Sequence, residues 1–160
     1  WAASLETSST PSVLSLSRQG LPCLRTEHTD ENLSSKGGYV LAEAEAKRDV
    51  TLIASGSEVA IAMEARDQLK AEGVSAVVVS MPCLDKFEEQ SQDYRDQVIQ
   101  PDTPVVVVEA AVEQSWGKYL GRKGKFIGMS TFGASAPANE LYEHFGITTQ
   151  NVVNAAKQIV

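Results

Sequence analysis

The hydrophobic residues of the chain occur in short runs separated by amphipathic stretches, which is the pattern of an α/β domain. Three runs are rich in apolar and β-branched residues on both faces, as in buried parallel strands; they are residues 50–54, 76–80 and 105–109. Between the first two runs, the apolar residues from Val59 to Leu69 recur with the helical period of about 3.6 residues. The pattern therefore predicts a strand–helix–strand unit with a right-handed crossover.

Further strands and helices are predicted around this unit. Short apolar runs predict strands at 39–41 and 125–128, and the helical period predicts helices at 87–98, 112–120, 138–145 and 149–160. Pro137 stands where a first helical turn tolerates proline, and Thr148 is expected to cap the last helix. Residues 38–160 thus predict a three-layer α/β/α domain with a mostly parallel, mixed five-stranded sheet.

The residues before this domain have a different pattern. Residues 1–10 are similar to the end of a helix followed by a Ser/Thr-rich turn, and residues 13–17 predict a short strand. The next stretch is polar and ends in Gly37-Gly38, and residues 30–33 are compatible with one turn of helix. We therefore expect residues 1–20 to be a remnant of a preceding domain, residues 21–37 a linker, and residues 38–160 one whole domain.

The composition narrows the class of partner. The 160 residues include 14 Lys and Arg against 21 Asp and Glu, which gives a formal net charge of −7. Nucleic acids and anionic membranes attract clustered positive charge, so we expect neither as the main partner. No apolar run approaches the roughly 18 residues that cross a bilayer. The two cysteines, Cys23 and Cys83, lack disulfide or metal spacing, so we expect no metal site and two reduced, partly buried thiols in a cytoplasmic protein.

Two places in the pattern are candidates for binding an anion. Ser55, Gly56 and Ser57 lie where a buried strand meets a helix, and the free amides of such a turn attract anions. A helix capped by Ser57 explains the same residues without a ligand. Arg18 directly follows the predicted strand 13–17, and ligands of α/β sheets gather at the carboxyl ends of strands. Its guanidinium could hold a phosphate or carboxylate through two hydrogen bonds, or form a surface ion pair.

Other segments are candidates for contact surfaces. The loop at 129–137 is dense in small residues and is compatible with a subunit interface or with an internal packing corner. Trp116, Tyr119 and Phe132 are expected to be exposed aromatic residues and are candidates for a subunit contact. No pair of a nucleophile and a base is visible in the sequence, so we expect no catalytic residue in this chain.

Several segments, taken together, resemble transketolases. They are LSRQGLP at 16–22, KGGYVL at 36–41, IASGSEV at 53–59, VVSMP at 78–82, TFGASAP at 131–137, HFG at 144–146 and NVV at 151–153. These segments occur in the order of the family and cover nearly the whole chain. Gly20 replaces an Asn that is common in the family, beside the Arg that the family retains.

This resemblance implies a fold and a function. Transketolases are homodimers that use thiamine diphosphate and Mg²⁺ to transfer a two-carbon ketol unit between sugar phosphates in the pentose phosphate pathway. The chain resembles the last strand of their pyrimidine-binding domain plus their C-terminal domain. Because the cofactor ligands would lie before Trp1, we expect no cofactor bound to this chain and no activity of the chain alone. Arg18 matches the family residue that contacts the substrate phosphate.

Two alternatives remain open from the sequence. The SRQ and TFG segments favour transketolase over 1-deoxyxylulose-5-phosphate synthase, but they separate it poorly from dihydroxyacetone synthase. A stand-alone regulatory module that binds an anion at the turn 55–58 is the alternative from another class of function. Cytoplasmic location is the expectation, and an organelle stays open because a targeting segment would precede the part of the protein described by this sequence.

Overall fold

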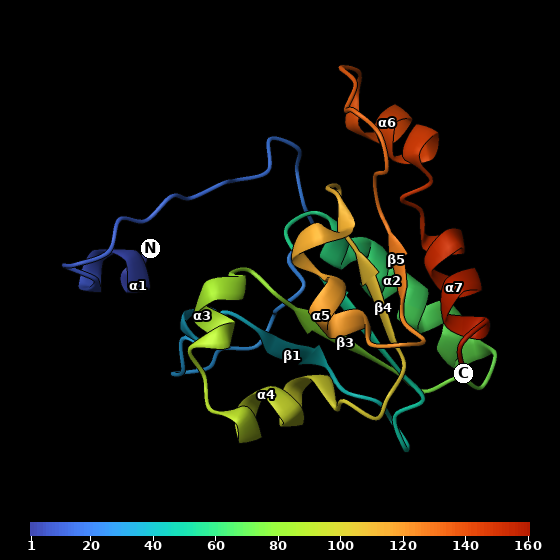
Figure 1. The fold of residues 1–160 in the computed structure, drawn as a ribbon, viewed down its shortest axis with the longest axis horizontal. Coiled ribbons are helices and arrows are strands. Elements are labelled where there is room, and N and C mark those ends of the chain that lie inside the picture. Colours follow the sequence, from blue (N-terminus) through green and yellow to red (C-terminus); the bar gives the residue numbers. More distant parts are fainter.

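Five strands form one mixed sheet at the centre of the molecule (Figure 1). The computed structural model describes residues 1–160. The strands lie in the order β1 (Tyr39–Ala42), β3 (Ala76–Ser80), β2 (Val50–Ala54), β4 (Val105–Val108) and β5 (Lys125–Ile127). The last four are parallel, whereas β1 runs antiparallel to β3 with a register shift between Val40 and Ala42. The predicted fold class and the mixed sheet are confirmed.

Neighbouring residues of β2 point into two separate cores, because side chains alternate across a strand. Leu52 packs in the core covered by α2 (Glu58–Ala71) and α7 (Thr149–Lys157). Ile53 packs in the opposite core, with residues of α3 (Leu84–Glu88), α4 (Gln92–Ile99) and α5 (Gly117–Leu120). Both side chains are fully buried. This arrangement explains why β2 carries apolar residues on both of its faces.

Side-chain caps set two of the helix starts. The Thr148 hydroxyl accepts a hydrogen bond from the amide of Asn151, which confirms the predicted cap of α7. The helix predicted at 87–98 is instead two helices, α3 and α4, because Ser91 begins a new helix by accepting from the amide of Tyr94. None of the helices is long and apolar enough to span a lipid bilayer.

The segment after β4 differs from its prediction. The helix expected at 112–120 is a 3₁₀ turn, η2 (Glu113–Ser115), followed by the single α turn of α5. Trp116 is buried in the core and Tyr119 is half-buried, so the expectation that both are exposed is wrong. Phe132 is 98% exposed, as predicted. Of the two free thiols, Cys83 is partly buried as expected, whereas Cys23 is exposed.

The N-terminal residues run away from the sheet as an extended segment (Figure 1). They contain one short helix, α1 (Ala2–Glu6), and lead into a 3₁₀ turn, η1 (Leu33–Lys36). The strand predicted at 13–17 does not form, because a strand needs a neighbouring strand and no backbone of this chain pairs with it. We refer to residues 8–22 as the N-terminal arm.

Gly37 fixes the point where the chain enters the domain. Its φ of +79° lies in the left-handed region that favours glycine, and a β-carbon there would lie 2.2 Å from the amide nitrogen of Phe87. Its carbonyl accepts a hydrogen bond of 3.0 Å from the amide of Cys83. The backbone between η1 and β1 therefore packs directly on the start of α3. The remaining helix, α6 (Ala138–Phe145), matches its prediction and follows the small-residue loop.

Candidate functional site

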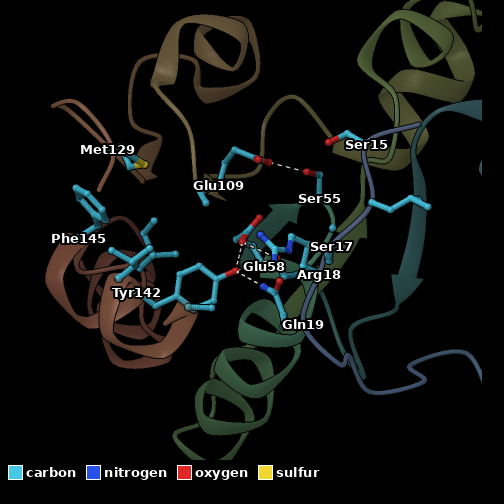
Figure 2. Close-up of a pocket in the computed structure, with 18 of the residues that line it drawn as sticks. Ser15, Ser17, Arg18, Gln19, Ser55, Glu58, Glu109, Met129, Tyr142 and Phe145 are labelled. Atoms are coloured by element: carbon cyan, nitrogen blue, oxygen red, sulfur yellow. Dashed lines mark hydrogen bonds between the residues drawn. The ribbon is translucent and has the colours of Figure 1, made fainter. Parts of the chain in front are cut away.

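A cleft of about 740 Å³ opens at the carboxyl edge of the sheet (Figure 2). One wall is the N-terminal arm, and the floor is the turn between β2 and α2. The residue after β4 and the inner face of α6 complete the lining. The side chains that matter below are Arg18, Gln19, Ser55, Glu58, Glu109 and Tyr142. The cleft thus brings together Arg18 and the turn 55–57, the two anion-binding candidates of the sequence.

Arg18 lies at the cleft with its guanidinium unpaired. The residue is exposed, and no carboxylate of the chain lies within ion-pairing distance of it. A guanidinium presents five N–H donors in a planar fork that matches the oxygens of a phosphate. All of these donors remain available to a ligand that enters the cleft.

The turn after β2 brings the chain close to the arm. Gly56 adopts a φ of +50°, and a β-carbon there would come within 3.8 Å of Ser17 Oγ. The position of the missing β-carbon of Gly56 therefore faces Ser17, the residue before Arg18. Gly56 allows both the turn and this approach.

The hydroxyl groups of the turn are bonded to carboxylates. Ser55 donates to Glu109 Oε2 at 2.7 Å, and Ser57 lies 3.0 Å from Glu58 Oε1. Ser57 occupies the N-cap position of α2 but forms no side-chain cap, so that part of the sequence expectation is wrong. An anion at this turn would meet two carboxylates, and the anion site at Ser55, Gly56 and Ser57 stays a prediction.

Glu109 retains its proton more strongly than an ordinary glutamate. Burial raises the pKa of its carboxyl, and the nearby charge of Glu58 raises the pKa further. The hydrogen bond from Ser55 acts in the opposite direction, because it stabilises the ionised form. Glu109 directly follows β4, as Arg18 follows the segment 13–17 that the sequence predicted as a strand, so the same signal in the sequence could have found it.

Tyr142 joins α6 to the N-terminal arm and to the turn between β2 and α2 (Figure 2). Its hydroxyl lies 2.5 Å from Glu58 Oε1 and 2.8 Å from Ser57 Oγ, and it accepts a hydrogen bond of 3.3 Å from Gln19 Nε2. Burial, together with the bond to Glu58, raises the pKa of the Tyr142 hydroxyl to about 12. Sequence reasoning missed Tyr142, since nothing in the pattern of α6 indicates which segment its polar group would meet.

The chain supplies no ligand set for a cation. No group of three or more His, Cys, Asp or Glu side chains is close enough to hold a metal ion. A diphosphate with Mg²⁺ needs several oxygen ligands in octahedral geometry around the ion. The residues of this chain therefore do not fit thiamine diphosphate with Mg²⁺, and the chemistry of the cleft is that of one guanidinium facing hydroxyl groups and carboxylates.

Comparison with known proteins identifies the family. The model of the transketolase-like C-terminal domain matches residues 37–148. The chain belongs to the transketolase family. A transketolase of Sinorhizobium medicae is 50% identical over 161 residues, which cover 100% of this chain and 23% of the relative. The chain therefore spans about a quarter of the length of such a transketolase, and the stand-alone module considered above is not favoured.

Solved transketolase structures share the fold. The transketolase of Leishmania mexicana is similar with a TM-score of 0.73 and 40% identity, covering 79% of this chain and 18% of that one. A Pichia stipitis transketolase in complex with sedoheptulose 7-phosphate gives a TM-score of 0.72 at 35% identity, with the same coverage of 79% and 18%. A split-gene transketolase, an inactive beta4 tetramer, gives 0.67 at 25% identity and covers 89% of this chain and 47% of that one.

Proposed function

We propose that this chain acts as the C-terminal part of a transketolase and that Arg18 binds the phosphate of its sugar phosphate substrates. In this proposal residues 1–20 belong to the preceding domain, residues 21–37 are a linker, and residues 38–160 are the C-terminal domain. The complete enzyme is a cytoplasmic homodimer of the pentose phosphate pathway that transfers a two-carbon ketol unit between sugars. The 50% identity of the whole chain to a transketolase supports this proposal.

The unpaired guanidinium of Arg18 carries the part of the proposal that concerns substrate. A sugar phosphate reaches the cleft as an anion, and a planar fork of N–H donors binds a phosphate through two parallel hydrogen bonds. The cleft of about 740 Å³ is large enough for a phosphate and part of a sugar. The sugar phosphate held in the related Pichia stipitis structure is consistent with this substrate class.

Arg18 would contribute binding energy and alignment, with no part in bond breaking. Contacts to a remote phosphate fix the position of the reacting carbonyl and so reduce the entropy that is lost on reaching the transition state. Thiamine diphosphate supplies the nucleophile and the electron sink when it is bound in the complete enzyme. Its ligands would come from the parts of the enzyme that precede this chain, and the chain alone is expected to be inactive. The inactive state of the split-gene tetramer is consistent with that expectation.

Replacing Arg18 in the complete enzyme tests the proposal. Arg18→Ala should raise KM for a phosphorylated ketol donor by about tenfold or more, the effect of losing a charge-assisted hydrogen-bond pair, with a smaller change in kcat. An unphosphorylated ketol donor should be used as well by the variant as by the parent. Arg18→Lys should recover part of the loss, since it keeps the charge but not the fork.

Arg25→Ala is the matched control, because Arg25 is exposed and stacks on Tyr39, with its guanidinium carbon 5.5 Å from the ring centroid and outside the cleft. It should leave both KM values unchanged. The 160-residue chain, assayed alongside, should show no transferase activity. Equal KM values for the phosphorylated donor in the Arg18→Ala variant and the parent would refute the role of Arg18.

A further inference from the structure

The positive charges of residues 38–160 are unevenly paired. Most of their Lys and Arg side chains lie within ion-pairing distance of a carboxylate. The exceptions are Lys47, Arg122, Lys123 and Lys125. Lys47 lies in the loop that leads into β2, and the other three lie in and after the turn that leads into β5. The unpaired positive charge is therefore concentrated where the parallel strands begin, at what we call the amino edge of the sheet.

A second cavity, of about 680 Å³, opens at this amino edge. Its walls are the segments that lead into β2, β4 and β5, whereas the cleft described above is lined by segments that follow the same strands. Lys47 and Lys123 line the second cavity, together with Arg48 and Thr103. Cavities of this size hold small-molecule ligands. The two cavities are therefore separate candidate sites at opposite edges of one sheet.

Arg48 supplies a buried guanidinium to the wall of the amino-edge cavity. Its side chain is 6% exposed, and Nη1 donates to the carbonyl oxygen of Val98 at 2.8 Å. Nη2 makes no hydrogen bond, because the one carboxylate within ion-pairing distance, that of Glu43, lies 3.8 Å away. Buried polar groups normally have a hydrogen-bond partner. Nη2 is therefore a donor that an anion in the cavity could satisfy.

Two glycines fix the turn that carries Lys123. Gly121 has a φ of +57° and a ψ of −150°, a backbone conformation that is essentially confined to glycine. A β-carbon at Gly124 would lie 2.2 Å from the carbonyl oxygen of Leu120, and the Gly124 amide donates to this same oxygen at 2.9 Å. The backbone of the turn is thus well defined, and it holds Lys123 at the cavity.

Aspartates also line the cavity and oppose its positive charge. Asp49 accepts a hydrogen bond from the amide of Ser75, and Asp96 accepts one from Gln92 Nε2. Asp102 accepts no hydrogen bond and forms no ion pair in the chain. Asp102 is therefore the carboxylate that can be neutralised without breaking an interaction, and its loss should favour an anion in the cavity.

We propose that the amino-edge cavity binds the phosphate group of a small molecule. Lys47 and Lys123 supply unpaired positive charge, and Arg48 supplies an unpartnered N–H donor. A phosphate can accept charge-assisted hydrogen bonds from all three at once, because its oxygens point in different directions. All of these groups belong to residues 38–160, so the site depends neither on Arg18 nor on the N-terminal arm.

Titration of the 160-residue chain with inorganic diphosphate at low salt measures this binding. The amide NMR signals of Lys47, Thr103 and Lys123 should shift as the ligand is added. Lys47→Ala and Lys123→Ala should each raise Kd by about two- to fivefold, the effect of losing one exposed charge pair. Asp102→Asn should lower Kd by about the same factor, because it removes a repulsive charge. A substitution that merely disturbed the fold would not strengthen binding.

Lys86→Ala is the matched control, because Lys86 pairs with Glu89 at 2.7 Å and lies outside the cavity. It should leave Kd unchanged. The proposal is overturned if the signals of Lys47, Thr103 and Lys123 do not shift, or if the shifts are confined to the turn 55–57 of the cleft. An unchanged Kd in both lysine variants, or weaker binding by Asp102→Asn, also overturns it.

The complete enzyme shows whether the rest of the protein leaves the cavity open. Calorimetric titration of the enzyme loaded with thiamine diphosphate should find an additional diphosphate site per chain in the parent, relative to a Lys47→Glu/Lys123→Glu variant. Equal numbers of sites would mean that the cavity is covered, and the proposal would be wrong.

The same variants separate this site from the function proposed above. Arg18→Ala should retain the additional diphosphate site, and Lys47→Glu/Lys123→Glu should retain the KM of the parent for a phosphorylated donor. If the additional site is present while Arg18→Ala leaves KM unchanged, the amino-edge site stands and the proposed role of Arg18 fails. If Arg18→Ala raises KM while the additional site is absent, the role of Arg18 stands and the amino-edge site fails.

Discussion

The charged residues of the cleft differ in sign and in their exposure to water. Arg18 is exposed, whereas Glu58 is almost fully buried and Glu109 is partly buried beside it. Burial of a carboxyl disfavours its ionised form, and the raised pKa of Glu109 expresses that cost. An ionised Glu109 carboxylate therefore lowers the free energy of unfolding near neutral pH.

Glu109→Gln should stabilise the protein at neutral pH. A folded-state pKa above the unfolded value means that the folded state binds the extra proton, so the Glu109 contribution to stability is lost as pH rises from the unfolded to the folded pKa. The amide has no charge to bury and its oxygen can still accept from Ser55. Thermal unfolding should give a higher Tm for the variant than for the parent near pH 7. The two Tm values should be equal below about pH 4, where the carboxyl of Glu109 is mostly protonated in the folded and in the unfolded protein.

Glu113→Gln is the control for this prediction, since Glu113 is exposed in the 3₁₀ turn η2 and does not line the cleft. It should leave Tm unchanged at both pH values. A lower Tm for Glu109→Gln near neutral pH would mean that the ionised carboxylate stabilises the fold.

The residues of the cleft were only partly predictable from the sequence. Arg18 and the turn 55–57 were named as candidates because each follows a predicted strand, and ligands of α/β sheets gather at strand ends. Both line the cleft, although the segment before Arg18 is not a strand. Tyr142 was not, because its partner Gln19 lies 123 positions away and only the folded chain brings them together. The Ser57 cap was predicted from residue type, but the neighbouring Glu58 carboxylate takes the hydroxyl instead.

At the scale of elements, helices and strands followed their patterns where the core fixed them. The three buried runs formed strands because their apolar side chains alternate between two apolar cores. Local polar chemistry decided the rest: Ser91 divided one predicted helix into two. The residues 13–17 have strand-like composition, yet hydrogen bonding to a neighbour, and not composition, makes a strand.

Gly37 shows how strongly one element boundary is fixed. Gly37→Ala should destabilise the fold by about 3 kcal/mol or more, because the left-handed backbone and the clash with the Phe87 amide act together. Gly73→Ala is the matched control, since Gly73 has a φ of +81° but open space around it. It should cost about 1 kcal/mol. Urea unfolding measures both, and equal losses would contradict the contact described at α3.

At the scale of the molecule, large apolar side chains are exposed mainly before the domain. Of those on the surface, the most exposed in the first 22 residues are Trp1 at 79%, Leu5 at 81%, Val13 at 93% and Leu16 at 70%. A concentration of exposed large apolar side chains in one segment is typical of a surface that another part of a protein covers. This is consistent with the proposal that these residues belong to a preceding domain of a longer transketolase.

Deleting residues 1–22 should therefore leave the domain intact. We expect the free energy of unfolding to change by no more than about 1 kcal/mol, since the Gln19 bond is the only hydrogen bond between these residues and the domain. Binding of a dye that reports exposed apolar surface should fall in the same variant. Deleting residues 1–38 instead removes Leu24 and the Gly37 contacts and should lower the free energy of unfolding measurably. Similar losses for both deletions would show that the first residues stabilise the domain.

The two edges of the sheet determine how this domain can meet another protein. The edge strand β5 has only three residues and begins with an exposed lysine, and the edge strand β1 is interrupted by its register shift. Short, charged or irregular edges are poor templates for pairing with a foreign strand. Copies of this domain, or the domain and the remainder of its enzyme, are therefore expected to associate through side-chain surfaces and not by continuing the sheet from one chain into the next.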